Sequence, residues 1–249
     1  ASGKNTYARY AERLAAEHRA EAMLREALRV GLTNDEFHLA FQPRFDLSTD
    51  SICGFEGLLR WDAGPNIGHL DRQPERFVTI AEQNGLISAL DSLSLDLACA
   101  QIRALMNRGV QVPVSVNMSV KRLQEADIVA QVIDALHRHG VPPHLLEIEL
   151  AEQALVNDLE ASIIKLAAVQ RLGVRCAIDD YGTGSSTIGD LARLPLDVLK
   201  IDESLISDID AVGPMGEYSR RSVQSIVALA AGLGLVVVAE GVETTQQRA

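Results

Sequence analysis

Short β-branched runs alternate with helix-length segments along most of this chain, and this alternation constrains the fold more than any other feature. The apolar runs lie at 112–119, 145–152, 174–184, 198–202 and 235–243. Each run is reached through a segment long enough to form a helix, which is the connection that a parallel strand pair needs. The pattern therefore predicts parallel β/α winding, an α/β fold and not a helix bundle or a β-sandwich.

The N-terminal part of the chain follows a different pattern. Two apolar runs, 37–43 and 52–61, are separated only by the polar stretch Leu47–Asp50. This connection is far shorter than a parallel crossover, so we expect an antiparallel hairpin. Upstream, apolar residues with helical spacing between 7 and 30, followed by Gly31, predict an amphipathic leader helix. The prediction is seven strands with the first inverted, and a division into a leader (1–30) and a main domain (31–249).

The charge and hydropathy of the chain argue against two classes of function. A formal net charge of -11 disfavours bulk nucleic-acid binding, because such proteins cluster Lys and Arg against phosphates. No apolar run approaches the ~20 residues of a membrane span, and the N-terminus lacks the layout of a signal peptide. We therefore expect a cytoplasmic chain without a membrane segment of its own; membrane attachment of a longer protein stays open.

Polar residues follow the apolar body of the predicted strands at their C-terminal ends. In a β/α barrel these ends converge on one face, where the active site is built. The sequence thereby predicts one pocket that collects seven carboxylates: Glu56, Glu149, Glu152, Asp179, Asp180, Glu240 and Glu243. Like charges at close range repel and raise one another's pKa, so this pocket needs cations.

Divalent metal ions would relieve this repulsion. Mg²⁺ and Mn²⁺ prefer carboxylate, carbonyl and water oxygens. Four strand ends supply such oxygens: Glu56, Asn117, Glu149 and Asp179. The adjacent pair Asp179 and Asp180 allows one carboxylate to bridge two metals while its neighbour turns to the second. Two metals roughly 3.5–4 Å apart suit phosphodiester hydrolysis, because they activate a water and stabilise the leaving oxygen.

Two basic residues complete the predicted pocket. Lys200 interrupts the apolar run Val-Leu-Lys-Ile-Asp, where a charge is rare unless it is paired. It is either a structural lysine neutralised by nearby carboxylates or a cation beside the attacked phosphate. Arg60 lies an even number of residues from Glu56 on one strand, so it faces the same way and is suited to grip a phosphate. Each residue alone also has an ordinary explanation, since a lone strand Glu is usually solvated and Asp-Gly clusters mark turns.

Taken in order, seven motifs resemble the EAL family of cyclic di-GMP phosphodiesterases. They are Gln42-Pro43, Glu56–Trp61, Val116–Ser119, Glu149–Glu152, Asp179–Gly184, Leu199–Asp202 and Ala239–Thr244. The match runs from about 34 to 249, and the ordered set is far more specific than any single motif. The resemblance implies a modified TIM barrel that opens cyclic di-GMP to linear pGpG with two Mg²⁺ or Mn²⁺ ions.

The resemblance also implies roles for individual residues. Ligands of one metal are expected to be Glu56, Asn117, Glu149 and Asp179. The second metal or its waters would be held by Asp179, Asp180 and Glu240. Lys200 resembles the family lysine that positions the attacking water, and Glu152 the glutamate that anchors the loop after Asp180. The expected catalytic residues are Glu56, Lys200, Glu240 and Glu152. Expected substrate contacts are Gln42, Leu58, Arg60, Asp91 and Glu243.

Three positions depart from the family pattern. Gly57 stands in place of the name-giving Ala, Ala151 in place of a usual Thr, and Ser185 in place of a usual aromatic residue. None of the three is a predicted metal ligand. Because the loop that contains Ser185 links metal binding to dimerisation in the family, these departures bear on regulation and homodimer geometry more than on chemistry.

Both ends of the chain carry further expectations. Residues 3–7 resemble the tail of a GGDEF diguanylate cyclase domain, so we expect such a domain upstream in the full-length protein, with 1–30 as its remnant and linker. Family members normally continue past the position of Ala249 with one more helix and an eighth strand. We therefore expect a barrel that lacks its last strand and exposes two strand edges.

A second hypothesis comes from a different functional class. A catalytically silent EAL domain would bind cyclic di-GMP as a receptor and relay the signal to a partner. Such receptors usually lack metal ligands, whereas every expected ligand type is present here, which favours the enzyme. A third hypothesis, an unrelated TIM-barrel enzyme, requires the ordered motif match to be accidental.

Overall fold

A curled, seven-stranded sheet forms the centre of the protein. The computed structural model describes residues 19–65, 67–68, 70–152, 155, 158–184 and 186–248. The strands are β1 (Phe37–Asp46), β2 (Ser51–Trp61), β3 (Val114–Asn117), β4 (Leu146–Ala151), β5 (Arg175–Tyr181), β6 (Val198–Ile201) and β7 (Val236–Ala239). They follow one another in sequence order across the sheet; β1 and β2 are antiparallel and every later pair is parallel. The predicted α/β fold with an inverted first strand is confirmed.

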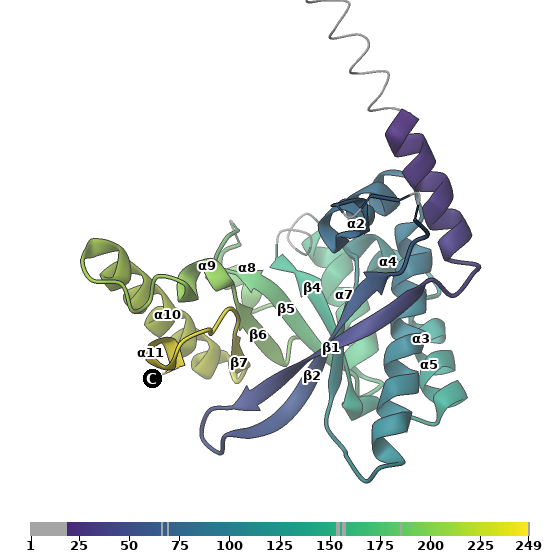
Figure 1. Ribbon diagram of the computed structural model, residues 1–249. Helices are drawn as coiled ribbons and strands as arrows, with labels where there is room; N and C mark the ends of the chain where they lie inside the picture. Colours follow the sequence, from purple (N-terminus) through teal and green to yellow (C-terminus); the bar gives the residue numbers. More distant parts are fainter. Residues whose placement is uncertain are drawn as a thin grey trace, which may run out of the picture.

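Helices cover the outer side of this sheet (Figure 1). Residues 19–31 are helical and precede β1. The later helical elements are η1 (Leu70–Arg72), α2 (Pro74–Gln83), α3 (Ile87–Met106), α4 (Val120–Gln124), α5 (Ile128–His139), η2 (Pro143–Leu145), α7 (Leu159–Gln170), α8 (Ile188–Leu191), α9 (Glu203–Ile206), α10 (Pro214–Leu233) and α11 (Thr245–Arg248). None of the described helices is both long and apolar enough to cross a membrane.

The connection between β3 and β4 contains two helices, α4 and α5, with a break between them. Ser119 caps α4, since its Oγ accepts from the backbone N–H of Arg122. The helix ends at Glu125, whose backbone is extended. This residue forms an ion pair with the buried Arg122, and its carbonyl oxygen accepts from Lys165 of α7 at 2.9 Å. The break is therefore supported by one local ion pair and by one hydrogen bond from the distant helix α7.

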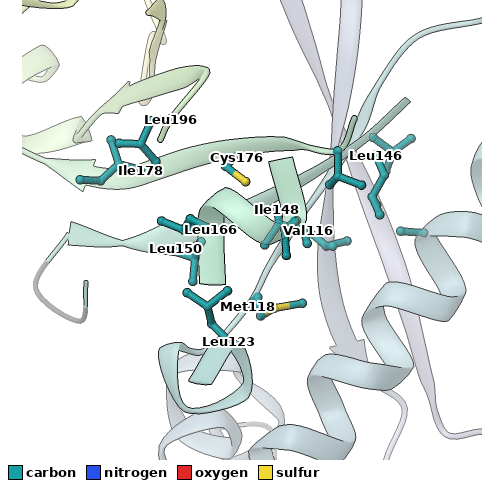
Figure 2. Close-up of a cluster of buried hydrophobic side chains, with 14 of the residues drawn as sticks. Val116, Met118, Leu123, Leu146, Ile148, Leu150, Leu166, Cys176, Ile178 and Leu196 are labelled. Atoms are coloured by element: carbon teal, nitrogen blue, oxygen red, sulfur yellow. The ribbon is translucent and has the colours of Figure 1, made fainter. Parts of the chain in front are cut away.

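The main hydrophobic core lies between the sheet and the helices. Outward-facing residues of successive strands, Val116, Ile148 and Ile178, pack with helix residues Leu123 and Leu166 (Figure 2). All five side chains are essentially inaccessible to solvent. Because side chains alternate along a strand, the residues between them face the opposite side of the sheet. The position of the core thus determines which residues face the inside of the barrel.

A second, smaller core connects the N-terminal helix to the hairpin of β1 and β2. Leu24 and Leu28 are buried there with Phe37, Trp61 and Phe77. The rings of Phe37 and Trp61 stack with their centroids 5.5 Å apart. The helical part of the predicted leader therefore packs against the domain. Its residues 1–18, including the GGDEF-like segment, lie outside the described ranges, and the division at residue 30 stays a prediction.

The sheet does not close into a full barrel in the part of the chain that the structure describes. β1 and β7 are its two edges, and each has one neighbouring strand. On β7, Val236 is 55% exposed, whereas the strands in the middle of the sheet are buried. The open sheet agrees with the expectation of two exposed strand edges.

Candidate active site

Lys200 of β6 lies at the centre of a cluster of carboxylates inside the curled sheet. Its side chain is 1% exposed, and its Nζ is surrounded by four acidic oxygens. The distances are 2.6 Å to Glu149 Oε2, 2.6 Å to Glu240 Oε1, 3.0 Å to Asp179 Oδ1 and 3.2 Å to Glu56 Oε2. The structure thus brings together residues from β2, β4, β5, β6 and the end of β7.

The register of the sheet explains how these side chains meet. Asn117, at the end of β3, is paired with Glu149 of β4. Its side-chain Nδ2 donates to Glu56 Oε1 at 3.3 Å. Inward-facing positions of parallel strands lie at neighbouring heights, so three strands contribute a polar group to one layer. The four residues predicted to hold one metal therefore lie together: Glu56, Asn117, Glu149 and Asp179.

An irregularity in β5 brings two adjacent aspartates to the same side. Strict alternation would send Asp179 and Asp180 to opposite faces of the sheet. Between Ile178 and Tyr181, however, the register against β6 shifts by one extra residue. Asp180 occupies the left-handed region with a φ of 57°, which Asp tolerates better than most residues. Ligand oxygens of Asp179, Asp180 and Glu240 consequently lie within 4.8 Å of one another.

The electrostatics of the cluster are dominated by burial. Burial lowers the pKa of Lys200, but Glu149 and the other carboxylates raise it more, so the ammonium stays charged. Burial raises the pKa of Glu149 to about 8 and that of Glu240 to about 7, although Lys200 opposes both shifts. Burial, and then the neighbouring Asp179, also raise the pKa of Asp180. One ammonium cannot neutralise this many acidic groups, so the site favours additional positive charge.

The residues of the cluster fit a divalent metal ion. All candidate ligands offer oxygen atoms, the type that Mg²⁺ and Mn²⁺ prefer. The oxygens of Asp179, Asp180 and Glu240 are already close enough to share an ion. Glu149 Oε1 is buried, and no other described residue gives it a hydrogen bond. An unpaired buried carboxylate oxygen is costly, and a metal ion would satisfy it.

Glu152 lies beside the cluster but serves the loop after β5. Its Oε2 accepts from the backbone N–H groups of Gly182 at 3.0 Å and Gly184 at 3.3 Å. Its Oε1 accepts from the backbone N–H of Ser186 at 3.1 Å and from the hydroxyl of the same residue. A Cβ on Gly184 would lie 2.5 Å from the carboxylate, so a glycine is needed there. Glu152 thus contacts the loop after Asp180, while its predicted role in catalysis stays a prediction; Ser185 of this loop lies outside the described residues.

The candidate substrate residues divide into two groups. Gln42 of β1 is paired with Glu56 and is exposed, while Leu58 and Arg60 are half-buried at successive inward positions of β2. These three border the carboxylate cluster along the hairpin. The other two, Asp91 and Glu243, are not among the carboxylates that contact Lys200.

Asp91 and Glu243 have different surroundings. Asp91, on α3, is 7% exposed, and its Oδ2 accepts from the backbone N–H of Ser119 at 3.1 Å and from the Ser119 hydroxyl at 2.5 Å. Glu243 is exposed after β7, and its backbone N–H donates to Gln247. Asp91 therefore supports the start of α4, and substrate contact by either residue stays a prediction.

Gly57, the departure from the EAL motif, occupies a tight position. A Cβ there would lie 3.1 Å from Leu39 Cδ1 and 3.2 Å from both Ser115 O and Val116 Cγ1. An alanine would require small shifts of these neighbours. The glycine removes no polar group from the site.

Sequence reasoning missed a second charged group inside the barrel. Arg44 of β1, Glu147 of β4 and Arg175 of β5 form a chain of ion pairs next to Glu149. The side chain of Glu147 is fully buried. Its position two residues before Glu149 in one strand was the available signal, because such residues share a face.

Fold and site together define a β/α-barrel protein with a buried, all-oxygen acidic centre. The EAL domain family matches residues 23–249, and the chain belongs to that family. The predicted family is thereby confirmed.

Two relatives come from Pseudomonas aeruginosa. The cyclic di-GMP phosphodiesterase NbdA is 38% identical over 250 residues, which cover 100% of this chain and 31% of NbdA. The bifunctional diguanylate cyclase/cyclic di-GMP phosphodiesterase MucR is 34% identical over 247 residues, which cover 99% of this chain and 35% of MucR. The chain thus spans about a third of the length of these relatives.

Solved structures share the fold of this chain. The PaMucR phosphodiesterase, in a complex with c-di-GMP, superposes with a TM-score of 0.83 at 35% identity, covering 91% of this chain and 89% of that one. The FimX EAL domain of Xanthomonas citri, also in complex with c-di-GMP, has a TM-score of 0.82 at 23% identity over 94% of this chain and 88% of its own. The FimX likeness supports the fold alone.

Proposed function

We propose that this chain is a metal-dependent phosphodiesterase that hydrolyses cyclic di-GMP to linear pGpG. The observation that carries the proposal is the buried cluster in which Lys200 Nζ contacts four carboxylates from different strands. A charge cluster of this kind is costly to bury and is retained where chemistry needs it. NbdA and MucR, two relatives named as cyclic di-GMP phosphodiesterases, supply the substrate class.

The proposal assigns two Mg²⁺ or Mn²⁺ ions to the cluster. One ion would be held by Glu56, Asn117, Glu149 and Asp179. The other ion or its waters would be held by Asp179, Asp180 and Glu240. When bound, such ions supply an activated water and stabilise the negative charge that develops on the phosphate.

The chain's own residues position the reacting groups. Lys200, fixed by its ion pairs, donates hydrogen bonds that orient the attacking water and offset charge on the phosphate. Arg60 and Gln42, on the hairpin beside Glu56, bind and orient the dinucleotide, and Leu58 lies between them as an apolar contact. Glu152 holds the loop after Asp180 and thereby keeps the Asp pair in place.

The proposal for the full-length protein includes an upstream GGDEF domain and a homodimer. Support for the former comes from the GGDEF-like residues 3–7 and from MucR, which is described as bifunctional. Sedimentation of the purified protein with and without Mg²⁺ tests the dimer. Sedimentation as a monomer under both conditions would contradict it.

One experiment separates the enzyme from the receptor hypothesis. The protein is incubated with cyclic di-GMP and Mg²⁺ or Mn²⁺, and pGpG is followed by chromatography. We expect turnover with either ion and none with Ca²⁺, whose looser coordination misplaces the water. A silent receptor would bind cyclic di-GMP without forming pGpG, and full activity in excess chelator would contradict the metal-dependent mechanism.

A further inference from the structure

Arg44 reaches the carboxylate cluster from the far side of the hairpin. It lies on β1 opposite Gly54 of β2. Its Nη1 is 2.5 Å from Glu147 Oε1 and 3.6 Å from Glu149 Oε1, both on β4. The guanidinium therefore reaches across the inner face of the sheet, past β2 and β3, to a strand that is not a neighbour of β1. A Cβ on Gly54 would lie 3.1 Å from Arg44 Nη2 and 3.2 Å from Nε, so the glycine provides the necessary space.

Glu147 anchors this arginine. The side chain of Glu147 is fully buried, while that of Arg44 is 12% exposed. Glu147 Oε1 accepts from Arg44 Nη1, and its Oε2 lies 3.4 Å from Arg175 Nε. A buried carboxylate is costly without such partners, so the contacts with these two cations hold the Glu147 side chain in place. Arg44 and Arg175 thus share one partner, but the ion pair to Glu149 is made by Arg44.

Glu149 lies between two cations that approach its two oxygens separately. Lys200 Nζ contacts Oε2 at 2.6 Å, and Arg44 Nη1 lies 3.6 Å from Oε1. The second distance is too long for a hydrogen bond, and Oε1 has none within the described ranges. It is nevertheless short enough for a direct electrostatic attraction in a buried site. The plane of the carboxylate is therefore held from both sides while Oε1 keeps a free lone pair.

We propose that Arg44 is a positioning residue of the acidic centre: anchored by Glu147, it holds the Glu149 carboxylate in the orientation that binds a divalent metal ion. The inference rests on the proposed function, because it assumes that Glu149 is a metal ligand. Groups that orient metal ligands typically contribute about 10–100-fold to metal affinity. Arg44 would act through Glu149 and would not itself contact the metal ion.

The test is the affinity of the purified chain for Mn²⁺ alone, measured by calorimetry without substrate. We expect Arg44→Met to weaken Mn²⁺ binding by about 10-fold or more. Arg44→Lys restores a cation at the same place and should stay within about three-fold of the parent, because a single nitrogen makes both contacts. Arg175→Met is the matched control, since it removes the other partner of Glu147 and leaves the Arg44–Glu149 pair in place.

A double variant separates positioning from stability. Arg44→Met leaves Glu147 short of a partner and could unfold the chain, whereas Arg44→Met/Glu147→Gln removes the uncompensated charge as well. We expect the folded double variant to bind Mn²⁺ as weakly as the single variant. Affinity within two-fold of the parent in the double variant, or an equal loss in Arg175→Met, would overturn the proposal.

Hydrolysis of cyclic di-GMP by the parent is measured in parallel and reports on the proposed function separately. A parent that binds Mn²⁺ without hydrolysis contradicts the phosphodiesterase, while the binding of the variants still decides the role of Arg44. If the parent hydrolyses the substrate and Arg44→Met binds Mn²⁺ as tightly as the parent, the positioning role alone is contradicted. A parent that binds no Mn²⁺ overturns the positioning role.

Discussion

The two faces of the same strands differ in chemistry. On β4, Ile148 and Leu150 face the helices and are buried among apolar side chains, whereas Glu147 and Glu149 face inward and are buried among cations. Burial of the outer residues stabilises the fold directly, by ~25 cal/mol per Å² of apolar area. Burial of the inner charges carries a desolvation cost, which their ion-pair partners offset. The net contribution of these charges to stability is therefore small.

This difference shows where the constraints on each face come from. The outer face needs apolar side chains of suitable volume, and many combinations satisfy that need. The inner face needs particular groups at particular distances, because an unpartnered charge is costly and a misplaced one is useless for chemistry. We therefore expect inner-face substitutions that leave no buried charge without a partner to change activity with little loss of fold, and outer-face substitutions to do the opposite.

The largest effect is expected for Glu56→Ala on the inner face, which should reduce hydrolysis below detection. Glu56 contacts Lys200 and Asn117 and is a proposed metal ligand. The fold should persist, because one fewer carboxylate reduces the repulsion in the cluster. Formation of pGpG and thermal unfolding are measured together. Glu160→Ala, a 73% exposed carboxylate on α7, is the control. Parent-like turnover by Glu56→Ala would show that the site is assigned wrongly.

Lys200→Met tests the centre of the inner face. If the ammonium orients the water, the rate should fall by ~10²–10³, or roughly 3–4 kcal/mol of transition-state stabilisation. Substrate affinity should fall much less, because the metals and Arg60 hold the ground state. Single-turnover hydrolysis at saturating Mg²⁺ measures this, with folding checked by circular dichroism. A folded variant within a few-fold of the parent rate would mean that Lys200 only neutralises the carboxylates.

Asp91 is a buried carboxylate that lies on a helix and not on the inner face of the sheet. Burial raises its pKa from 3.8 to about 6, although the hydrogen bonds from Ser119 lower it. The folded state therefore binds this proton more tightly than the unfolded state. Protonated Asp91 therefore stabilises the folded state, and this stabilisation is fully present below about pH 4. It is lost as the pH rises to about 6, and the free energy of unfolding falls by about 3 kcal/mol in total.

Asp91→Asn should remove this pH dependence. Relative to the parent, its free energy of unfolding should rise by about 3 kcal/mol between pH 4 and pH 7. Urea unfolding at the two pH values measures the difference, and Asp208→Asn, at an exposed position, is the control. An equal change in both variants would argue against a special environment for Asp91.

The smallest effect is expected for Ile148→Val on the outer face. Removing one buried methylene there should lower the free energy of unfolding by about 1 kcal/mol. Hydrolysis under saturating Mg²⁺ should stay within two-fold of the parent, because the side chain lies in the apolar core near Leu166 and Val116 (Figure 2), on the face of β4 opposite to Glu149. Chemical unfolding and turnover are compared. A large loss of activity in a folded variant would break the division between the two faces.

Much of the fold could be predicted because its signals are local. The short Leu47–Asp50 connection predicted the hairpin, and the helix-length segments predicted the parallel order of β2 to β7. The break between α4 and α5 was missed, since the helix-length segment between the runs 112–119 and 145–152 contains no proline or glycine at the break. Lys165 of α7 donates to the carbonyl oxygen of Glu125 at the break, and such a contact between distant segments leaves no local pattern.

The site was predicted in part for the same reason. The convergence of strand ends follows from the α/β fold, so Glu56, Asn117, Glu149 and Asp179 were expected to meet. The individual roles came from the family resemblance. The seven carboxylates do not form one group, however, because Glu152 turns to the loop of Gly182 and Gly184 instead of contacting Lys200.

The sequence by itself determined the family, the order of the strands and the kinds of side chain at the strand ends. Only the tertiary structure decided that Lys200 lies among four carboxylates, that a register shift turns Asp179 and Asp180 to one side, and that Arg44 reaches past β2 and β3 to Glu149. The physical reason is the range of each effect. Alternation and helix periodicity depend on neighbours in the chain, whereas distances across the barrel depend on the curl of the whole sheet and on one extra residue in one strand.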